Sequence, residues 1–309
     1  MRIQDSFFSA PNRNRSKAYT AAKEAENAKK QAKAERKAER AAKKKRKSKK
    51  GTDTPELVPN TVPWAIENTK KLGILNLSKM QLESVPDEVF ESLPGTARIL
   101  NISFNRITEL DTRLCDYVLV QRLIANGNLL SSIPQNIVRM TALKKLDLAS
   151  NKLTSLPDAF TGMRVLEHVD LSDNKLSELP PSFAELQLTA LSLGRNAFTT
   201  APLQVTSMEW LMALDLSHNQ ITSVPESYMS LTQLTALNLE HNKLADFPNV
   251  ILQMCVELVT LRLTDNPMRM AALEGKASYV DFAERRRTKL RRQLDAGTIT
   301  EADLLPCNP

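Results

Sequence analysis

Histidines and carboxylates are the side chains of this 309-residue chain whose spacing could support metal chemistry. His218 and His241 are 23 residues apart and occupy the same place in two similar segments, close to Asp215 and Glu240 respectively. Imidazole and carboxylate groups are ligands of zinc and other transition metals. Because the spacing supplies no third ligand, we expect histidines that hydrogen-bond along the protein surface, with neither a metal site nor a cofactor.

The sequence contains no recognisable catalytic motif. It has no glycine-rich loop ending in Gly-Lys, no Gly-x-Ser-x-Gly elbow, no His-Glu-x-x-His and no Cys-x-x-Cys pair. The three cysteines, Cys115, Cys255 and Cys307, match no zinc or redox spacing, which favours a reducing compartment. A chain without a convergent set of titratable groups is typical of a binding protein, so we expect no enzymatic activity.

The strongest charge lies near the start of the chain. Residues 1–50 carry eighteen Lys and Arg against five Asp and Glu, a balance of +13. Because the whole chain carries +7, residues 51–309 carry −6. A basic arm of this kind attracts an acidic surface, on a partner or on the chain itself. We predict that the densest run makes this contact through Lys43, Lys44, Lys45, Arg46, Lys47, Lys49 and Lys50.

The chemistry of the arm leaves its partner open. RNA, an acidic protein tail, a tubulin-like surface and anionic lipid all offer negative charge, and a solvated arm without a partner is a further alternative. No aromatic residue follows Tyr19 within the arm, so base stacking is not indicated. Residues 16–50 are rich in helix formers, but their alanine stripe buries little surface. We therefore expect a helical or disordered arm that orders on binding.

A recurring pattern of leucines around one asparagine organises the rest of the chain. Residues 143–157 read LKKLDLASNKLTSLP, that is LxxLxLxxNxLxxLP. The pattern recurs nine times within residues 72–268, and its asparagine position repeats every 22 to 25 residues. Such a period over most of a chain indicates a solenoid. The asparagine positions are Met80, a substitution, and Asn105, Asn128, Asn151, Asn174, Asn196, Asn219, Asn242 and Asn266.

Each repeat predicts one short strand followed by a sharp turn. In residues 145–149 the side chains alternate, so Leu146 and Leu148 face inward and Asp147 faces outward. The asparagine amide then pairs with backbone groups that have lost a strand partner. Met80 cannot make these bonds, so we expect an irregular or shielded first repeat. The proline that follows the last leucine predicts a short helical or 3₁₀ turn on the far side of the coil.

This pattern resembles the leucine-rich repeat family, in its short LPxx-type class. The flanking segments, residues 71–77 and 273–285, are similar to the family named leucine-rich repeat-containing protein 57. The resemblance implies a non-enzymatic α/β solenoid, or horseshoe, with a parallel strand ladder. We expect residues 1–52 to be the basic arm, 53–71 a linker and N-terminal cap with a helix over 64–71, 72–268 the nine repeats, and 269–309 a C-terminal capping helix, over 270–294, and tail.

The outward strand positions are predicted to line the concave face, which in solenoids forms an extended binding surface. Its middle is polar and acidic, with Phe104 and Ile124 as candidate apolar anchors; a merely solvated strand face is the alternative. We predict that another protein is bound there by Phe104, Arg122, Ile124, Lys145, Asp147, His168, Asp170, Asp173, Arg195, Asp215, His218, Glu240, His241 and Arg262.

These features together predict an intracellular protein-interaction scaffold that is monomeric by itself. No apolar run approaches the roughly 20 residues that cross a bilayer, and the first residues form no apolar signal segment. We expect a cytoplasmic protein that can also be nuclear, because the cluster at residues 43–47 resembles a nuclear-localisation signal. The alternatives are an RNA-associated component acting through the arm, and a cytoskeletal or ciliary structural protein.

Overall fold

A computed structural model of the chain describes residues 61–92, 95 and 97–295. The predicted basic arm, residues 1–52, lies outside the described residues, together with the seven cations of its densest run. The predicted C-terminal tail lies outside them from residue 296 onward.

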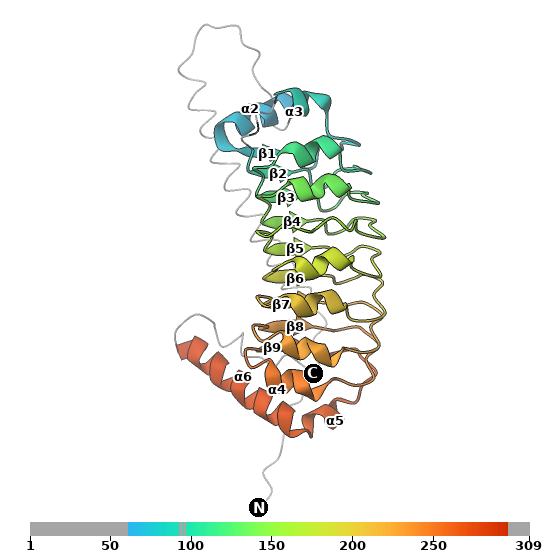
Figure 1. Cartoon of the computed structure of the whole chain (residues 1–309), viewed down its shortest axis with the longest axis vertical. Coiled ribbons are helices and arrows are strands. Elements are labelled where there is room, and N and C mark those ends of the chain that lie inside the picture. Colours follow the sequence, from blue (N-terminus) through green and yellow to red (C-terminus); the bar gives the residue numbers. More distant parts are fainter. Residues whose placement is uncertain (1–60, 93–94, 96, 296–309) are drawn as a thin grey trace, which may run out of the picture. The chain divides into compact units, whose positions relative to one another are not determined.

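Nine short strands make one parallel sheet within the described residues, in the order of the sequence. Each strand pairs in register with the next, and Figure 1 shows them stacked one above another. The predicted solenoid with a parallel ladder is therefore confirmed. The strands are β1 Ile74–Asn76, β2 Ile99–Asn101, β3 Arg122–Ile124, β4 Lys145–Asp147, β5 His168–Asp170, β6 Ala190–Ser192, β7 Ala213–Asp215, β8 Ala236–Asn238 and β9 Thr260–Arg262.

The core runs along the stack because every strand turns its middle residue inward. These nine aliphatic side chains, from Leu75 to Leu261, are at most 6% exposed. Aromatic side chains fill the opposite side of the coils, where the rings of Phe160 and Phe183 meet edge to face at 4.7 Å. Each coil therefore buries its apolar face against its two neighbours, as in other solenoids.

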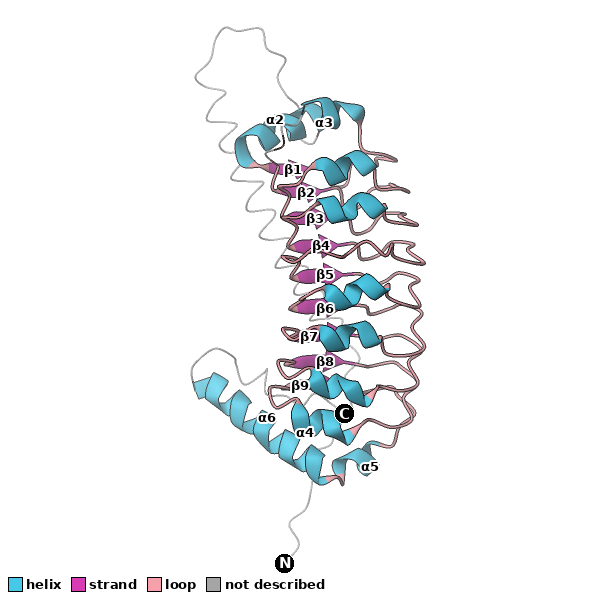
Figure 2. Ribbon diagram, viewed as in Figure 1, coloured by secondary structure: helices cyan, strands magenta, loops and turns pink. Residues whose placement is uncertain are grey.

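Short helices follow six of the prolines, as predicted, and one more follows Asp111; Figure 2 shows these helices in a column of their own beside the strands. The return between β4 and β5 has no helix among the described residues. There the Asp158 carboxylate accepts the Ser182 N–H at 2.8 Å, which ties the segment to the next coil. The short helices are α3 Asp87–Ser92, η1 Thr112–Asp116, η2 Gln135–Arg139, η3 Pro181–Glu185, η4 Leu203–Ser207, η5 Glu226–Ser230 and α4 Asn249–Met254, where η marks a 3₁₀ helix.

The asparagines form the predicted ladder of amides, buried at Asn105, Asn128, Asn151, Asn219 and Asn242 and half-buried at the other three positions. Asn219 donates from Nδ2 to the carbonyls of Leu193 and Leu216, both at 3.0 Å, and its Oδ1 accepts the N–H of Phe198 at 3.1 Å. The amide thus joins two successive coils, those of β6 and β7, through backbone groups that the strands leave unpaired. The other seven asparagines of the column make corresponding bonds.

The first repeat is irregular and shielded, as expected where Met80 replaces the asparagine. The residues on either side of it, Lys79 and Gln81, both adopt left-handed backbone conformations, with φ of 60° and 57°. The N–H of Met80 donates instead to Oδ1 of Asn105, at 2.9 Å, so the second repeat supplies the missing acceptor. The helix α2, Val62–Leu72, packs beside β1 and covers this end of the core.

The C-terminal cap differs from the single helix expected over residues 270–294. It consists of α5, Met270–Glu274, and α6, Ala277–Asp295, because the chain turns at Gly275 and Lys276. Lys276 donates its N–H to the carbonyl of Leu273 at 3.0 Å, which closes α5 before α6 begins.

The side chains of α6 complete the last coil. Phe282 is buried against it. Arg285, Arg286 and Lys289 donate to the backbone carbonyls of Leu252, Val259 and Val256, respectively. These bonds satisfy carbonyl groups that have no further repeat to pair with.

Candidate functional site

The first and third residues of each strand face outward and form two rows, which together we call the strand face. Neighbours within a row are about 4.8 Å apart, and the rows are separated by a two-residue step of about 6.6 Å. From β3 to β9 the first row contains Arg122, Lys145, His168, Ala190, Ala213, Ala236 and Thr260. The third row contains Ile124, Asp147, Asp170, Ser192, Asp215, Asn238 and Arg262.

An open groove of about 520 Å³ runs along these rows from β3 to β9. In its β3–β5 half the first row is basic and the third row carries two carboxylates. In its β6–β8 half the first row consists of alanines, so this row presents only methyl groups, while the third row carries Ser192, Asp215 and Asn238. The groove therefore combines a charged half with a half that has room for a larger side chain.

The third-row carboxylates are held in fixed orientations by their own turns. Oδ1 of Asp147 accepts the N–H of Ala149 at 3.2 Å, and Oδ1 of Asp215 accepts that of Ser217 at 2.9 Å. Asp170 makes the same bond to the N–H of Ser172, at 3.0 Å. Each carboxylate uses one oxygen in this way, and for the other no partner is found among the described residues.

Burial and neighbouring charge alter the acidity of the groove. Burial raises the pKa of Asp147 to about 6, and the neighbouring Asp170 adds to this, while the Ala149 N–H opposes it. Burial and the charge of Lys145 lower the pKa of His168, which keeps this imidazole neutral at pH 7. The protonation states of Asp147 and His168 therefore depend on the charges beside them, including those of a bound ligand.

A further row borders the strand face, one residue before each asparagine. Its members adopt left-handed backbone conformations, with φ of 55° at Phe104 and 53° at His218. Phe104 is 54% exposed and lies over Gly127, where an added Cβ would stand 2.7 Å from the ring. Lys79 places its ammonium 5.4 Å from the centre of this ring. We call the residues before the asparagines the edge row: Phe104, Gly127, Ser150, Asp173, Arg195, His218, His241 and Asp265.

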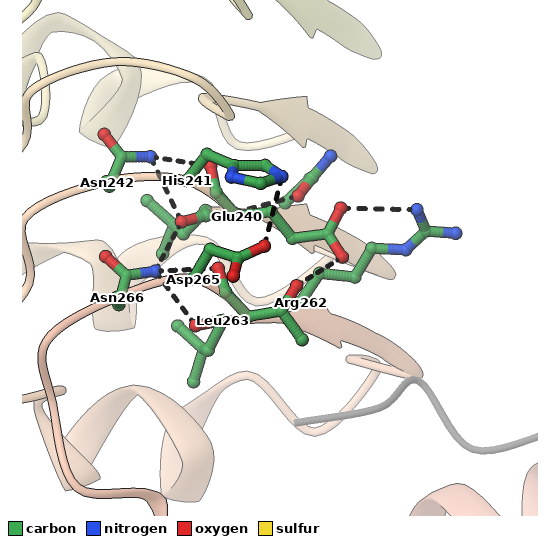
Figure 3. A network of polar contacts seen from close by, with 10 residues as sticks. Glu240, His241, Asn242, Arg262, Leu263, Asp265 and Asn266 are labelled. Carbon is green, nitrogen blue, oxygen red and sulfur yellow. Dashed lines mark hydrogen bonds and ion pairs between the residues drawn. The ribbon is translucent and has the colours of Figure 1, made fainter. Parts of the chain in front are cut away.

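The two histidines of the edge row stack on each other. The rings of His218 and His241 are 4.1 Å apart and inclined by 18°. Nε2 of His241 also lies 3.2 Å from Oδ2 of Asp265 in the next coil (Figure 3). Burial, Arg195 and His241 all lower the pKa of His218. Among the described residues, no three His, Cys, Asp or Glu side chains gather where they could hold a metal ion.

The C-terminal end of the strand face is closed by a polar network (Figure 3). Glu240 accepts the hydroxyl of Thr264 at 2.7 Å and lies 3.6 Å from Nη1 of Arg262. Two of the predicted partner-binding residues, Glu240 and Arg262, are therefore paired with each other.

The predicted site residues fall into three places. Glu240 belongs to the polar network, and Phe104, Asp173, Arg195, His218 and His241 belong to the edge row. The groove contains Arg122, Ile124, Lys145, Asp147, His168, Asp170, Asp215 and Arg262. The sequence reasoning missed the alanine floor, Ala190, Ala213 and Ala236, although alanine at the same strand position in three successive repeats is visible in the sequence.

Comparisons with known proteins agree with this geometry. A family model described as leucine rich repeat matches residues 118–176, 141–198, 186–244 and 209–268. The fold superposes on a leucine-rich repeat protein of Leptospira interrogans with a TM-score of 0.61 at 28% identity, covering 69% of this chain and 60% of that one.

Two curated relatives match over short segments. Plant intracellular Ras-group-related LRR protein 7 of Oryza sativa subsp. japonica is 38% identical over 68 residues, which are 22% of this chain and 26% of that protein. Adenylate cyclase of Schizosaccharomyces pombe is 34% identical over 85 residues, which are 28% of this chain and 5% of that protein. The chain thus spans only a small part of either relative. Within the described part of the chain, no helix is both long and apolar enough to cross a membrane.

Proposed function

Because this chain is a leucine-rich repeat protein, we propose that it is a non-enzymatic interaction scaffold that binds a partner protein on its strand face. Solenoids of this kind present extended surfaces for protein partners. The observation that carries the proposal is the groove of about 520 Å³, which is lined by two rows of chemically different side chains. We include the predicted edge-row residues and Glu240 in the same surface.

The rigidity of the groove supports this proposal. Asp147, Asp170 and Asp215 are already oriented by bonds to backbone N–H groups. Side chains that are held in one orientation before binding lose less conformational entropy when a partner arrives. The buried asparagine ladder holds the strands beneath them, so the rows keep their spacing.

Isosteric neutralisation of the three carboxylates tests the proposal. The triple variant Asp147→Asn, Asp170→Asn, Asp215→Asn keeps each turn-closing oxygen and removes three charges. A matched control, Glu109→Gln, Glu178→Gln, Glu226→Gln, removes three exposed charges from outside the strand face. Tagged full-length proteins are recovered from native lysate, and bound proteins are quantified by mass spectrometry.

We expect the recovery of a partner protein to fall at least tenfold in the triple variant, while the wild type and the control recover it equally. Equal recovery of every partner by all three proteins would show that the strand face does not bind them.

We propose in addition that the basic arm, through the cluster at residues 43–50, adds affinity for an acidic surface. The charge of +13 over residues 1–50 favours this role. An RNA-associated component is the alternative, and it predicts association that nuclease abolishes and that falls steeply with salt. A cytoskeletal or ciliary protein predicts association that resists nuclease.

The oligomeric state, the location in the cell and the closer family relationship of the chain are also proposals. We propose a monomer in the cytoplasm or nucleus, related to the family named leucine-rich repeat-containing protein 57. The similarity of residues 71–77 and 273–285 to that family supports the relationship. Light scattering and imaging of the tagged full-length chain test the oligomeric state and the location.

A further inference from the structure

The β3–β5 half of the groove presents two unlike charges side by side. Arg122 and Lys145 lie in the first row, and Asp147 and Asp170 lie in the third row of neighbouring strands. Among the described residues, no ion pair joins the two rows in this half, although pairs form elsewhere on the surface. Both rows therefore have charge available for a ligand, and a ligand of one sign only would be repelled by one row.

The β6–β8 half has a different chemistry. Ala190, Ala213 and Ala236 lie next to one another in the first row and leave a floor of methyl groups. Their third-row neighbours are polar: Ser192, Asp215 and Asn238. A bulky apolar side chain of a ligand could lie on this floor and be removed from water.

The distance between the two halves sets the spacing within the ligand. The midpoint of β4 and β5 is two and a half strand spacings from β7, about 12 Å at about 4.8 Å per strand. An extended peptide rises by about 3.3 Å per residue, so this distance spans three or four residues.

Given the proposed function, on which this inference rests, we infer that the groove recognises an extended protein segment of defined chemistry. The segment carries an acidic and a basic side chain next to each other, and a bulky apolar side chain three or four residues from the basic one. Asp147 and Asp170 bind the basic group through their free oxygens, and Arg122 and Lys145 bind the acidic one. Charge-assisted bonds of this type are the strong ones, particularly to a guanidinium.

A random library of twelve-residue peptides displayed on phage tests the inference. The library is selected on the immobilised full-length chain, and enriched peptides are synthesised with a fluorescent label for polarisation measurements. We expect aligned binders to share the charge pair and the apolar residue at the stated spacing. Enriched peptides without this combination, or with an acidic residue alone, would overturn the inference.

Matched variants connect each peptide residue to its part of the groove. Asp147→Asn with Asp170→Asn is expected to weaken a selected peptide about tenfold, and to have little effect on the same peptide with its basic residue changed to Gln. Ala213→Phe fills the floor. It is expected to weaken the selected peptide about tenfold and to have little effect on the same peptide without its apolar residue. Thr260→Phe, in the same row at β9, is the control and should leave binding within twofold. If the change in the protein and the change in the peptide weaken binding additively, that peptide residue does not contact the assigned part of the groove.

The inferred segment and the proposed function can fail separately. If a natural partner is lost in the carboxylate triple variant while the selected peptides share no such spacing, the strand face binds protein and the inferred segment is wrong. If peptides of the inferred type bind but no natural partner depends on the carboxylates, the proposed function fails.

Discussion

Replacing Asn219 by alanine removes a buried amide that joins its own coil to the preceding one. Its Nδ2 donates to the carbonyls of Leu193 at 3.0 Å, Leu216 at 3.0 Å and Ser217 at 3.1 Å, and its Oδ1 accepts the Phe198 N–H at 3.1 Å. Asn219 is 7% exposed, so water does not readily replace these bonds. A buried polar group left without a partner costs about 1 to 3 kcal/mol.

Three or more backbone groups are affected, and partial relaxation of the coil recovers some of the loss. We therefore expect Asn219→Ala to lower the free energy of unfolding by about 3 to 5 kcal/mol. This is a large part of the total for a chain whose stability is about 5 to 15 kcal/mol. Urea unfolding of the full-length chain, followed by far-ultraviolet circular dichroism, measures the change.

Asn238→Ala is the matched control. Asn238 is half-buried on the strand face, and among the described residues its Oδ1 accepts the N–H of Glu240 alone, at 3.1 Å. We expect a loss of less than about 1 kcal/mol there. If Asn219→Ala loses no more than Asn238→Ala, the buried amides do not hold the coils together and our reasoning about the ladder is wrong.

Three other perturbations follow from single contacts. The pKa of about 6 at Asp147, against 3.8 in an unfolded chain, means that its ionisation opposes folding, and the stability present below pH 3.8 falls as the pH rises through 6. The full difference corresponds to about 3 kcal/mol, which partial exposure reduces to about 1 to 2. Asp147→Asn should therefore raise the melting temperature at pH 8 and not at pH 3.5; equal shifts at both would contradict this. Gly127→Ala should cost about 1 to 2 kcal/mol, because φ is 68° and the new Cβ meets Phe104, and Phe104→Ala should relieve only the steric share. If the double variant is as stable as Phe104→Ala alone, backbone strain is absent. Burial raises the pKa of Cys115 and Cys255 to about 11, so both thiols should resist iodoacetamide at pH 8 until urea unfolds the chain, as peptide mass spectrometry can show; labelling of the Cys115 or Cys255 peptide in the native protein would refute their burial, whereas labelling of Cys307 would not bear on it.

The solenoid could be predicted because its determinants are local and repeated. Leu146 and Leu148 alternate with Asp147, and Asn151 follows at a constant distance, so one coil predicts the next. Even the departure at Met80 was interpretable, because its side chain lacks the donor and acceptor that the turn needs.

Features that depend on how coils meet could not be read from the sequence. The turn at Gly275 divides the C-terminal cap, although residues 270–294 have helical periodicity throughout. His218 and His241 stack because adjacent parallel strands lie about 4.8 Å apart, whereas the pattern indicated only hydrogen bonds. Left-handed backbone at His218 is also unexpected, since glycine usually occupies such positions.

The binding surface was predicted in its charged part and missed in its apolar part. Charged residues such as Asp147 and Arg122 are conspicuous on a strand face. Alanines such as Ala213 form a site only through the space they leave, and that space becomes apparent once three strands are placed side by side.

Site-specific photo-crosslinking tests the central claim most directly. A benzophenone amino acid is placed at Ser192, in the middle of the third row, or at Ser223, an exposed position away from the strand face, in the full-length chain expressed in its native cells. Binding on the strand face predicts a discrete protein adduct from Ser192 that is absent at Ser223 and disappears when Asp147, Asp170 and Asp215 are changed to Asn. Adducts that form equally at both positions, or only at Ser223, would contradict the claim that the strand face binds the partner.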